Sequence, residues 1–303
     1  MTDNETEHKE IEKLGPPEDE KIDNPFFAYG IFKPGQLGFS QIKRVKDKYS
    51  KTMTIPYKMY YRDGIPLIDD KTTKFSETKG NIIYFTNKEE AYKIIGNAEP
   101  NKLYKWGVIK INDDPVNVLF GIDPTNGSYE DDYDCSCYDF RNDYYFTVAM
   151  KIVKDFIDKD IEIGMDGEEF FQYQMHYTLL WSIIERYGSF KYGKSTIATN
   201  NSKISSNKTF KKELKQQIHR TESKYKIRRS NDVVYASNNH EDWELDKNSY
   251  SSMKYYYTVR SNLVHRGKSQ SFDDKQRIRH SLRELYYAFK AVLDEDIAGQ
   301  NLK

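Results

Sequence analysis

The stretch from Glu168 to Tyr187 constrains the fold of this chain more than any other. Apolar residues occupy most of its positions and recur on nearly every side of a helix. A helix that is apolar on most sides is buried among other helices. This stretch therefore predicts an all-α helical bundle in the C-terminal half of the chain, with residues 168–187 at its centre.

Two further segments have the pattern of bundle helices. Between Tyr144 and Ile157, apolar residues recur at intervals of three and four. The last helix is expected to begin at Ser271-Phe272-Asp273-Asp274, a capping-box pattern that places acids at the positive end of the helix dipole. Its apolar face consists of Ile278, Leu282, Leu285, Phe289 and Val292. We expect the bundle to cover residues 142–303.

Residues 25–125 have a different pattern, in which short apolar runs alternate with turn signals. Strands are expected at residues 26–29, 53–61, 65–68, 80–85, 103–111 and 116–121, with Asp63-Gly64 as a hairpin turn. Helices are expected at 36–49 and 88–95. Because strands outnumber helices, this half is predicted to be an α+β domain with a small, barrel-like mixed sheet.

Length and charge limit the classes of protein that this chain can be. A length of 303 residues favours two domains of roughly 150 residues each. The net charge is zero, so nucleic-acid binding would require a local basic patch. The chain has no run of about eighteen apolar residues, and its N-terminus is acidic, unlike a signal peptide. We expect a cytoplasmic protein that does not enter a membrane.

Three segments are not expected to carry chemistry. Residues 1–24 hold nine acids against three lysines and are predicted to be an acidic tail that is disordered or loosely docked. Residues 126–141 are predicted to connect the two domains. Cys135 and Cys137 are separated by one residue, and no second Cys/His pair lies near them. We expect a reduced pair there, with no metal and no cofactor.

The N-terminal domain has a recognisable order of motifs. The first strand is followed by the loop Tyr29-Gly30-Ile31-Phe32-Lys33-Pro34-Gly35, and a later strand has the sequence Gly80-Asn81-Ile82-Ile83-Tyr84. Ile94-Ile95-Gly96-Asn97-Ala98-Glu99-Pro100 then ends a helix before Tyr104. Over residues 25–125 this order is similar to the gamma-glutamylcyclotransferase-like family. Ile31 stands where the family has Ser or Thr, and Pro100 replaces a glycine.

The resemblance implies a second site. Tyr29, Gly30 and Ile31 would form the loop that cradles the substrate, and Glu99 would be the general acid/base. In the family, this carboxylate moves a proton while the substrate's amine attacks its own side-chain carbonyl. Two alternatives stay open for this chain. One is turnover of such a substrate, and the other is binding of a small ligand or a partner without turnover.

Residues 191–229 are strongly basic in an otherwise neutral chain. Their twelve lysines and arginines exceed their two glutamates by ten charges. We expect a basic loop that attracts a phosphate backbone, and the alternative is a lysine-rich loop that is only solvated. The residues expected to contact RNA, in this loop and at the end of the next helix, are Lys211, Lys212, Arg228, Arg229, Arg266 and Lys268.

Residues 255–268 combine aromatic, cationic, amide and imidazole side chains on one expected helix. The apolar stripe that docks this helix consists of Met253, Tyr256, Val259 and Leu263. Arg260 and His265 are five positions apart, about 140° around a helix, whereas Asn262 and His265 are neighbours. Because Arg260 and His265 diverge, a compact site is more easily assembled across a two-fold axis between two copies of the chain.

A charged segment and a long final helix follow the motif Tyr257-Thr258-Val259-Arg260-Ser261-Asn262-Leu263-Val264-His265-Arg266-Gly267-Lys268. It resembles the abortive-infection branch of the HEPN superfamily, whose signature is an Arg and a His on one bundle helix. The resemblance covers roughly residues 140–300. It implies metal-independent RNA cleavage by a homodimer or higher homo-oligomer. Arg260 and His265 would be catalytic. The superfamily often has a polar residue such as Asn directly after the Arg; here Ser261 occupies that position, and Asn262, one residue later, would be the polar helper.

Three classes of function follow from these patterns. The first is a HEPN-type endoribonuclease, a phage-defence or toxin-like effector controlled by its N-terminal domain. The second is a cyclotransferase-like small-molecule enzyme with a dimerising bundle, and the third is a non-catalytic nucleotide-binding or scaffold protein. A purely structural alternative has His265 capping the helix end and Arg260 paired with an acid. For His176 we expect a histidine that is hydrogen-bonded inside the bundle. For Glu185, which stands beside Arg186, we expect an intrahelical or cross-helix ion pair, and the alternative is an acid that faces the active groove.

Overall fold

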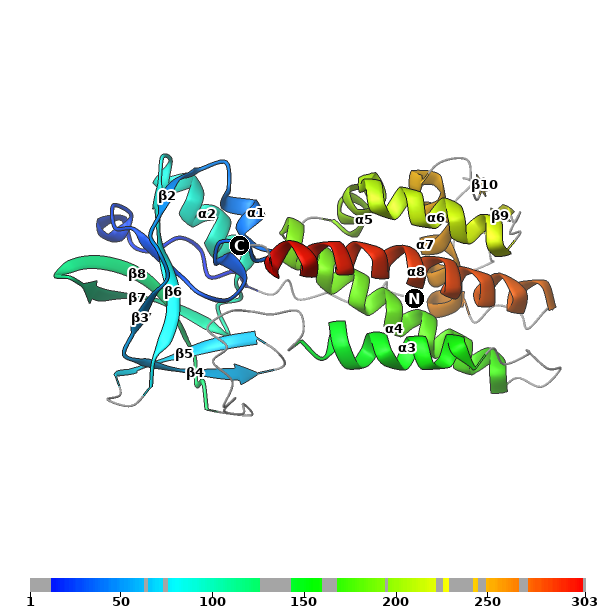
Figure 1. The fold of residues 1–303 in the computed structure, drawn as a ribbon, viewed down its shortest axis with the longest axis horizontal. Helices are drawn as coiled ribbons and strands as arrows, with labels where there is room; N and C mark the ends of the chain where they lie inside the picture. The colour runs from blue at the N-terminus through cyan, green and yellow to red at the C-terminus, as the bar shows by residue number, and fades with distance from the viewer. Residues whose placement is uncertain are drawn as a thin grey trace, which may run out of the picture. The chain divides into compact units, whose positions relative to one another are not determined.

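The computed structural model describes residues 12–62, 65–72, 76–125, 143–159, 168–193, 196–221, 226–228, 242–244, 249–266 and 272–301. Of these, only the backbone is described at 226–228, 242–244, 265–266, 272–275 and 300–301. The chain divides into two compact units, residues 1–139 and 140–303. The first unit contains a sheet and the second is mainly helical, which confirms the predicted contrast between the two halves (Figure 1).

The first unit is built on one mixed sheet. Its strands are β1 (Phe26–Ala28), β2 (Lys46–Tyr49), β3 (Met53–Ile55), β6 (Thr78–Phe85), β7 (Tyr104–Ile111) and β8 (Asp114–Gly121). Their order is β2-β6-β1-β8-β7, and β3 also pairs with β6. Strand β1 is antiparallel to β6 and parallel to β8. A separate antiparallel pair consists of β4 (Tyr57–Arg62) and β5 (Ile65–Thr72).

Helix α2 (Lys88–Ala98) packs against this sheet. Its first turn is capped by the Asn87 side chain, which accepts a hydrogen bond from the backbone N–H of Glu90. Tyr92 on its buried face packs edge-on against Phe85 of β6, with 5.6 Å between ring centroids. The helix ends before Pro100, because a residue that precedes proline disfavours helical backbone. Glu99 is accordingly extended and lies directly after the last helical turn.

Residues 12–24 are docked on the first unit by hydrogen bonds, so the expectation of disorder is wrong for them. The backbone N–H of Leu14 donates to the Glu99 carbonyl at 3.0 Å, and the indole N–H of Trp106 donates to the Gly15 carbonyl at 2.8 Å. A side chain at Gly96 would collide with Gly15, so α2 and this segment are in close contact. Backbone hydrogen bonding thus outweighs the acidic composition that suggested disorder. Residues 1–11 lie outside the described part of the chain.

The helix predicted at residues 36–49 is also wrong. The turn Gly30–Phe32 is followed by the short helix α1 (Phe39–Ile42), and β2 occupies only the last four residues of the segment, Lys46–Tyr49. Strand β2 pairs with β6, and the hydroxyl of Ser50 accepts a hydrogen bond from the backbone N–H of Ile82 at 2.9 Å. Sheet pairing therefore overrides the local helical spacing, since propensity is a weak prior against tertiary contacts.

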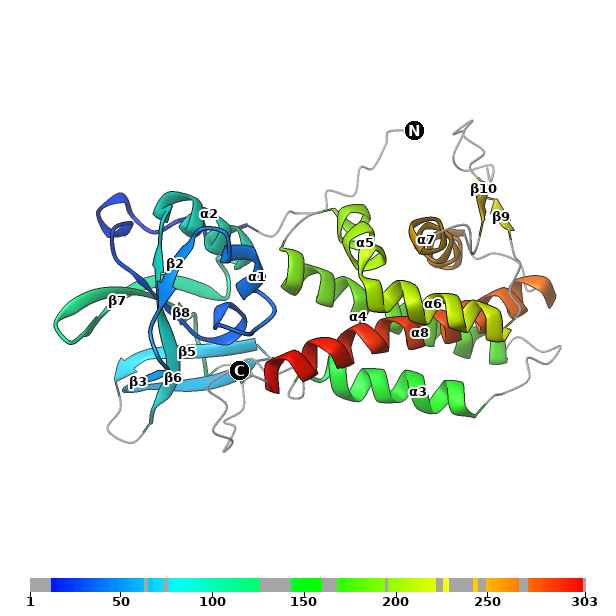
Figure 2. The same cartoon turned by 45° about the horizontal axis from the view of Figure 1, so that its top comes forward.

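The second unit is dominated by helices. After a π-helical turn at Tyr145–Ala149, they are α3 (Met150–Asp158), α4 (Glu168–Tyr192), α5 (Ile197–Ser206), α6 (Lys208–Thr221), α7 (Ser249–Arg266) and α8 (Phe272–Asn301). A short antiparallel pair, β9 (Lys226–Arg228) and β10 (Asp242–Glu244), precedes α7. Figures 1 and 2 show α8 alongside α4 and α6, with which it makes many contacts. Among the described helices, none is long and apolar enough to cross a membrane.

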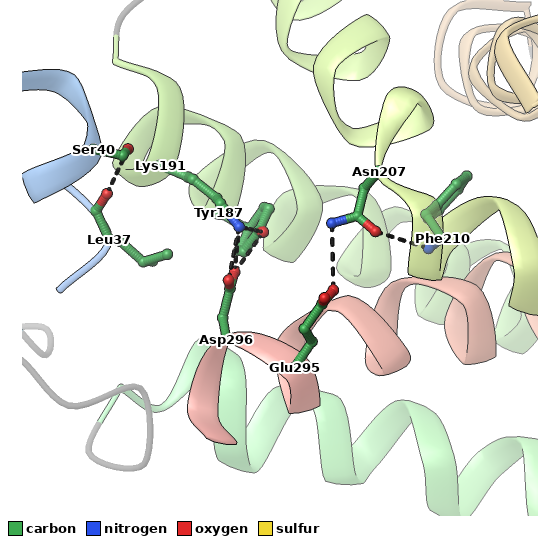
Figure 3. Close-up of polar contacts among 8 residues, drawn as sticks. All are labelled: Leu37, Ser40, Tyr187, Lys191, Asn207, Phe210, Glu295 and Asp296. Atoms are coloured by element: carbon green, nitrogen blue, oxygen red, sulfur yellow. Dashed lines mark hydrogen bonds and ion pairs between the residues drawn. The ribbon is translucent and has the colours of Figure 1, made fainter. Parts of the chain in front are cut away.

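The basic segment 191–229, predicted to be a loop, is largely helical. Helices α5 and α6 fill most of it, because apolar residues at intervals of four lie hidden among its lysines. Phe210, Leu214 and Ile218 form the buried face of α6. Asn207 caps this helix by accepting a hydrogen bond from the backbone N–H of Phe210 at 3.0 Å (Figure 3).

A polar cluster joins the C-terminal ends of α4 and α8. Asp296 on α8 accepts hydrogen bonds from the Tyr187 hydroxyl at 2.7 Å and from the Lys191 ammonium group at 2.7 and 2.8 Å (Figure 3). Asn207 adds a long contact of 3.5 Å to Glu295, one residue earlier on α8. These charge-assisted contacts fix the register between the two helices.

Candidate functional site

Helix α7 carries the residues singled out by sequence. Its predicted apolar stripe is confirmed, because Met253, Tyr256, Val259 and Leu263 are all buried. Helix α4 also holds α7 through its backbone. The Tyr177 hydroxyl donates to the Tyr256 carbonyl at 2.8 Å, and the Gln174 amide donates to the Leu263 carbonyl at 3.3 Å. These contacts fix α7 about one turn before and one turn after Arg260.

Arg260 lies beside an acid at the contact between α7 and α4. Its Nη2 atom is 3.4 Å from Oε1 of Glu185, which makes the cross-helix ion pair expected of that glutamate. The guanidinium also lies over the Tyr257 ring, 5.6 Å from the centroid. Tyr257 in turn packs edge-on against Trp181, with 5.5 Å between ring centroids. Two aromatic rings and a carboxylate therefore determine where the guanidinium sits.

This pair leaves hydrogen-bonding capacity unused. Nε of Arg260 and Oε1 of Glu185 are buried, and neither has a hydrogen-bond partner among the described residues. Their side chains retain 21% and 28% of their surface, so solvent reaches part of both groups. A guanidinium carries five N–H donors in a planar fork that matches phosphate oxygens. Arg260 can thus bind a phosphate while Glu185 remains its counter-ion.

Burial raises the pKa of Glu185 above 4.5, and the nearby charge of Arg260 offsets part of this rise. Between pH 4.5 and the raised pKa, the folded protein keeps a proton that the unfolded chain has released. The carboxyl group therefore favours the folded state most at low pH, and this contribution declines as pH rises through the window. We expect the parent to lose stability relative to Glu185→Gln between pH 4.5 and neutrality.

Unfolding free energies of the two proteins, measured by urea denaturation at several pH values, check this expectation. Because all other groups are common to both proteins, their titration cancels in the difference. A difference between Glu185→Gln and the parent that stays constant over this pH range would contradict the assigned burial of the carboxyl group.

Asn262 and His265 follow Arg260 on the same helix. Asn262 is buried, with 8% of its surface exposed. His265 lies in the last turn of α7, and its side chain is outside the described part of the chain. Since α7 is helical through residue 266, the positions of Arg260 and His265 diverge by about 140°. One copy of α7 therefore does not place both residues on a shared face.

The residues expected to contact RNA are described only in part. Lys211 and Lys212 are exposed on α6. The backbone places Arg228 in β9 and Arg266 at the end of α7, and nothing is described of their side chains. Arg229 and Lys268 lie outside the described ranges.

The first unit brings Glu99 and Tyr29 together. Glu99 is 8% exposed. Burial is the main cause of a raised pKa at Tyr29, and the Glu99 carboxylate raises it further. The pKa of Tyr104 is raised by the same two causes. The two hydroxyls donate to backbone carbonyls, Tyr29 to Leu119 at 2.6 Å and Tyr104 to Pro66 at 2.7 Å. A buried carboxylate and two tyrosines thus form one cluster.

The loop after β1 turns through a left-handed backbone conformation at Gly30. Gly30 has φ +62°, and a Cβ there would lie 2.8 Å from the Pro66 side chain. Only glycine fits this position without strain. Ile31 is half-buried and faces Gly38. This loop brings Tyr29 and Gly30 close to the β5 residue that accepts the Tyr104 hydrogen bond.

Sequence reasoning missed two polar residues of these sites. The positive charge of Arg62 on β4 offsets part of the rise in the pKa of Tyr104. Arg62 also donates a hydrogen bond to the Ile122 carbonyl at 3.2 Å. Tyr104 was part of the motif order but was not assigned to the site. Neither has a periodic signal, because their positions depend on how the β4-β5 pair packs against the sheet. A charged residue next to the Asp63-Gly64 turn signal is the only hint that the sequence offers.

His176 is a half-buried histidine with a hydrogen-bond partner, as expected. Its ring stacks on Phe156 with centroids 3.9 Å apart, and its Nδ1 is 2.6 Å from the Gln172 carbonyl. Within the described residues, no three His, Cys, Asp or Glu side chains are grouped as metal ligands. Cys135 and Cys137 fall outside this part of the chain.

No protein-family model, no curated protein and no solved structure matches this chain.

Proposed function

We propose that this protein is a metal-independent endoribonuclease of the HEPN type, with Arg260 and His265 as its catalytic residues. The proposal includes a HEPN-type bundle in residues 142–303 and a barrel-like, cyclotransferase-like domain in residues 25–125. The observation that carries it is Arg260, a partly exposed guanidinium held by Glu185 and Tyr257 with its Nε unused. The exposed part of this guanidinium can donate to phosphate oxygens, which match its planar fork of N–H groups.

In the proposed reaction, the 2′-hydroxyl of a ribose attacks the adjacent phosphorus while its proton passes to a base. The bond from phosphorus to the 5′-oxygen breaks, and that oxygen takes a proton from an acid. His265 serves as the base or the acid, because imidazole titrates near neutral pH. Arg260 binds the scissile phosphate and stabilises the negative charge that develops on it. The products are a 2′,3′-cyclic phosphate and a 5′-hydroxyl.

Glu185 is a positioning residue in this proposal. It acts on the reaction through Arg260, which it holds against α4. Asn262, one turn before His265, is assigned to orient the imidazole or the substrate. Because Arg260 and His265 diverge on α7, the proposed active unit is a homodimer, in which two copies of α7 face each other. Light scattering that detects only monomers at the assay concentration would remove this part of the proposal.

The biological role proposed is that of a phage-defence or toxin-like effector. The exposed Lys211 and Lys212 of α6 guide the RNA backbone, together with the other basic residues expected from the sequence. The first unit, with its buried Glu99 cluster, is assigned to sense a small molecule or to restrain the nuclease. Incubation of the purified protein with cellular RNA, beside a His265→Ala variant, tests the proposal. If the parent and His265→Ala leave the RNA equally intact, the proposed nuclease activity is refuted.

A second candidate function is favoured by the cluster of Glu99, Tyr29 and Tyr104. Its carboxylate acts electrostatically on Tyr29, which directly precedes the glycine turn at Gly30, and the motifs follow the order of a gamma-glutamylcyclotransferase-like enzyme. Glu99 would transfer a proton while the substrate's amine closes on its own side-chain carbonyl and releases 5-oxoproline.

If this activity is present, we expect Glu99→Gln to lower release of 5-oxoproline from gamma-glutamyl dipeptides by about 10²–10⁴-fold, the usual effect of losing a general acid/base. Glu89→Gln is the matched control, since Glu89 is an exposed glutamate on α2, the helix that ends just before Glu99. Chromatographic measurement of 5-oxoproline checks the result. No release by the parent protein, or equal release by both variants, would end this candidate.

A further inference from the structure

Strand β2, at one border of the sheet in the first unit, carries an excess of positive charge. It lies at the end of the strand order, with β6 as its neighbour (Figure 2). Residues 43–51, which contain β2, hold five cations and a single acid, Asp47. The cations are Lys43, Arg44, Lys46, Lys48 and Lys51. Because a local excess of this kind attracts a phosphate backbone, a chain that is neutral as a whole can still bind nucleic acid here.

Three of these cations have no acid to neutralise them. Arg44 pairs with Glu90 of α2. Lys43, Lys48 and Lys51 are exposed, and none of them forms an ion pair with a residue that the structure describes. Their charges are therefore available to an anionic ligand.

Two tyrosine rings lie next to the lysines of β2. Tyr49 on β2 and Tyr84 on β6 expose 48% and 38% of their surface. The Lys46 ammonium group lies 5.3 Å from the centroid of the Tyr49 ring, and that of Lys48 lies 5.1 Å from the centroid of the Tyr84 ring. Exposed rings beside cations are the two components that hold single-stranded nucleic acid, because bases stack on the rings while cations track the backbone.

The backbone of β2 produces this arrangement. The strand has a bulge between its pairs with Phe85 and Ile83 of β6. Two residues of β2, Asp47 and Lys48, therefore oppose the single residue Tyr84. Bulges and lysines at a sheet border also prevent pairing with another strand. Prevention of pairing does not require two exposed tyrosine rings, whereas a nucleic-acid ligand accounts for both the rings and the charge.

We propose that this surface, the β2 edge, binds single-stranded nucleic acid. The β2 edge consists of Lys43, Lys46, Lys48, Tyr49, Lys51 and Tyr84. Its tyrosines stack on bases and its lysines contact phosphates. A duplex is disfavoured, because its bases are stacked on one another and offer the tyrosines no free face. The assignment goes beyond the proposed nuclease activity and does not depend on it, since the β2 edge contains none of the proposed nuclease residues.

Photo-cross-linking to the full-length protein shows where the nucleic acid lies. The probe is a single-stranded DNA of about 12 nucleotides that contains 5-iododeoxyuridine, a length within the site sizes of small β-domains. DNA lacks the 2′-hydroxyl that the proposed nuclease attacks with, so cleavage does not affect the result. We expect mass spectrometry to find cross-links on the peptides that contain Tyr49 and Tyr84. Cross-links confined to the second unit would overturn the proposal.

Competition identifies which nucleic acid the β2 edge prefers. The competitors are unlabelled DNA and 2′-O-methyl RNA of the same sequence, neither of which has a free 2′-hydroxyl. Stronger competition by one of them identifies the preferred sugar, and equal competition shows that the surface accepts both. Failure of both to displace the probe contradicts specific binding.

The matched charge variants are Lys48→Gln and Lys110→Gln. Each removes one exposed positive charge from a border strand of the sheet, but Lys110 lies on β7, at the other end of the strand order. The binding constant is measured by fluorescence anisotropy at several salt concentrations. We expect Lys48→Gln to reduce the steepness of log binding constant against log salt by about 0.7, the contribution of one phosphate contact to a single strand, and Lys110→Gln to leave it unchanged. An equal effect of the two variants would contradict the proposal.

The stacking role is tested at Tyr84. We expect Tyr84→Ala to weaken binding of the oligonucleotide at least about fivefold and Tyr84→Phe, which keeps the ring, to bind like the parent. Circular dichroism verifies that the variants fold, and Tyr49→Ala on the border strand repeats the test if Tyr84→Ala does not. The proposal is overturned if Tyr84→Ala and Tyr84→Phe bind equally, or if a duplex of the same length or polyglutamate binds as tightly as the single strand.

Discussion

Replacement of Trp181 with alanine is expected to lower the free energy of unfolding of the helical unit by about 3–5 kcal/mol, the usual cost of truncating a buried tryptophan. Trp181 lies on α4 and is fully buried. Its indole packs edge-on against Tyr177 of the same helix and Tyr257 of α7, with ring centroids 6.5 and 5.5 Å away. Removing it leaves a cavity at the α4-α7 contact, which the helices cannot fill without shifting.

Met175→Ala is the control for this prediction, because Met175 lies on the same helix and is 61% exposed. We expect it to change stability by no more than about 0.5 kcal/mol. Urea denaturation followed by the helical circular dichroism signal measures both variants. A loss below about 1 kcal/mol in Trp181→Ala would mean that the α4-α7 contact is not the core described above.

Replacement of His265 with alanine is expected to reduce RNA cleavage by about 10²–10⁴-fold, the contribution typical of a general acid or base. The stability of the protein should change little, because His265 lies at the C-terminal end of α7, beyond its last described buried residue, Leu263. Cleavage rates of parent and variant on the same RNA, at equal protein concentration, give the measurement. Unchanged unfolding free energy separates loss of chemistry from loss of fold.

His176→Ala provides the matched control for the nuclease assay. This residue stacks on Phe156 and bonds to the Gln172 carbonyl, and it has no place in the proposed site. We expect its cleavage rate to equal that of the parent. An equal reduction in both histidine variants would indicate that the effect is structural, and equal full activity in both would remove His265 from the mechanism.

Sequence periodicity predicted helices whose apolar face can be recognised within a single segment of the chain. The apolar faces of α7 and α8 have a clear helical repeat, and the residues predicted for these faces are buried. Helix α4 is buried less completely than its composition suggested, because Phe171 and Met175 are exposed. Residues 197–221 are also helical, but their abundant lysines and serines concealed the repeat of Phe210, Leu214 and Ile218. Residues 36–49 failed for another reason, because pairing of β2 with β6 is a contact between distant segments.

Polar contacts between distant segments were also harder to predict than features of a single helix. The sequence offered Glu185 as an ion-pairing residue, but it did not identify Arg260 as the partner, since that depends on how α4 crosses α7. No role was assigned to Arg279, His280 and Arg283, because they lie outside the apolar face used to recognise α8. For Glu99 and Tyr29, the motif order of a known family suggested a proximity that periodicity does not supply.

The chemical ends of the RNA fragments test the central proposal most directly. Purified protein is incubated with cellular RNA in excess EDTA, and the products are labelled with a kinase that acts on 5′-hydroxyls. The account predicts fragments with 5′-hydroxyl ends and 2′,3′-cyclic phosphates, formed by the parent and by His176→Ala but lost in His265→Ala. Fragments with 5′-phosphate and 3′-hydroxyl ends, or the same fragments at the same rate from His265→Ala, would contradict it.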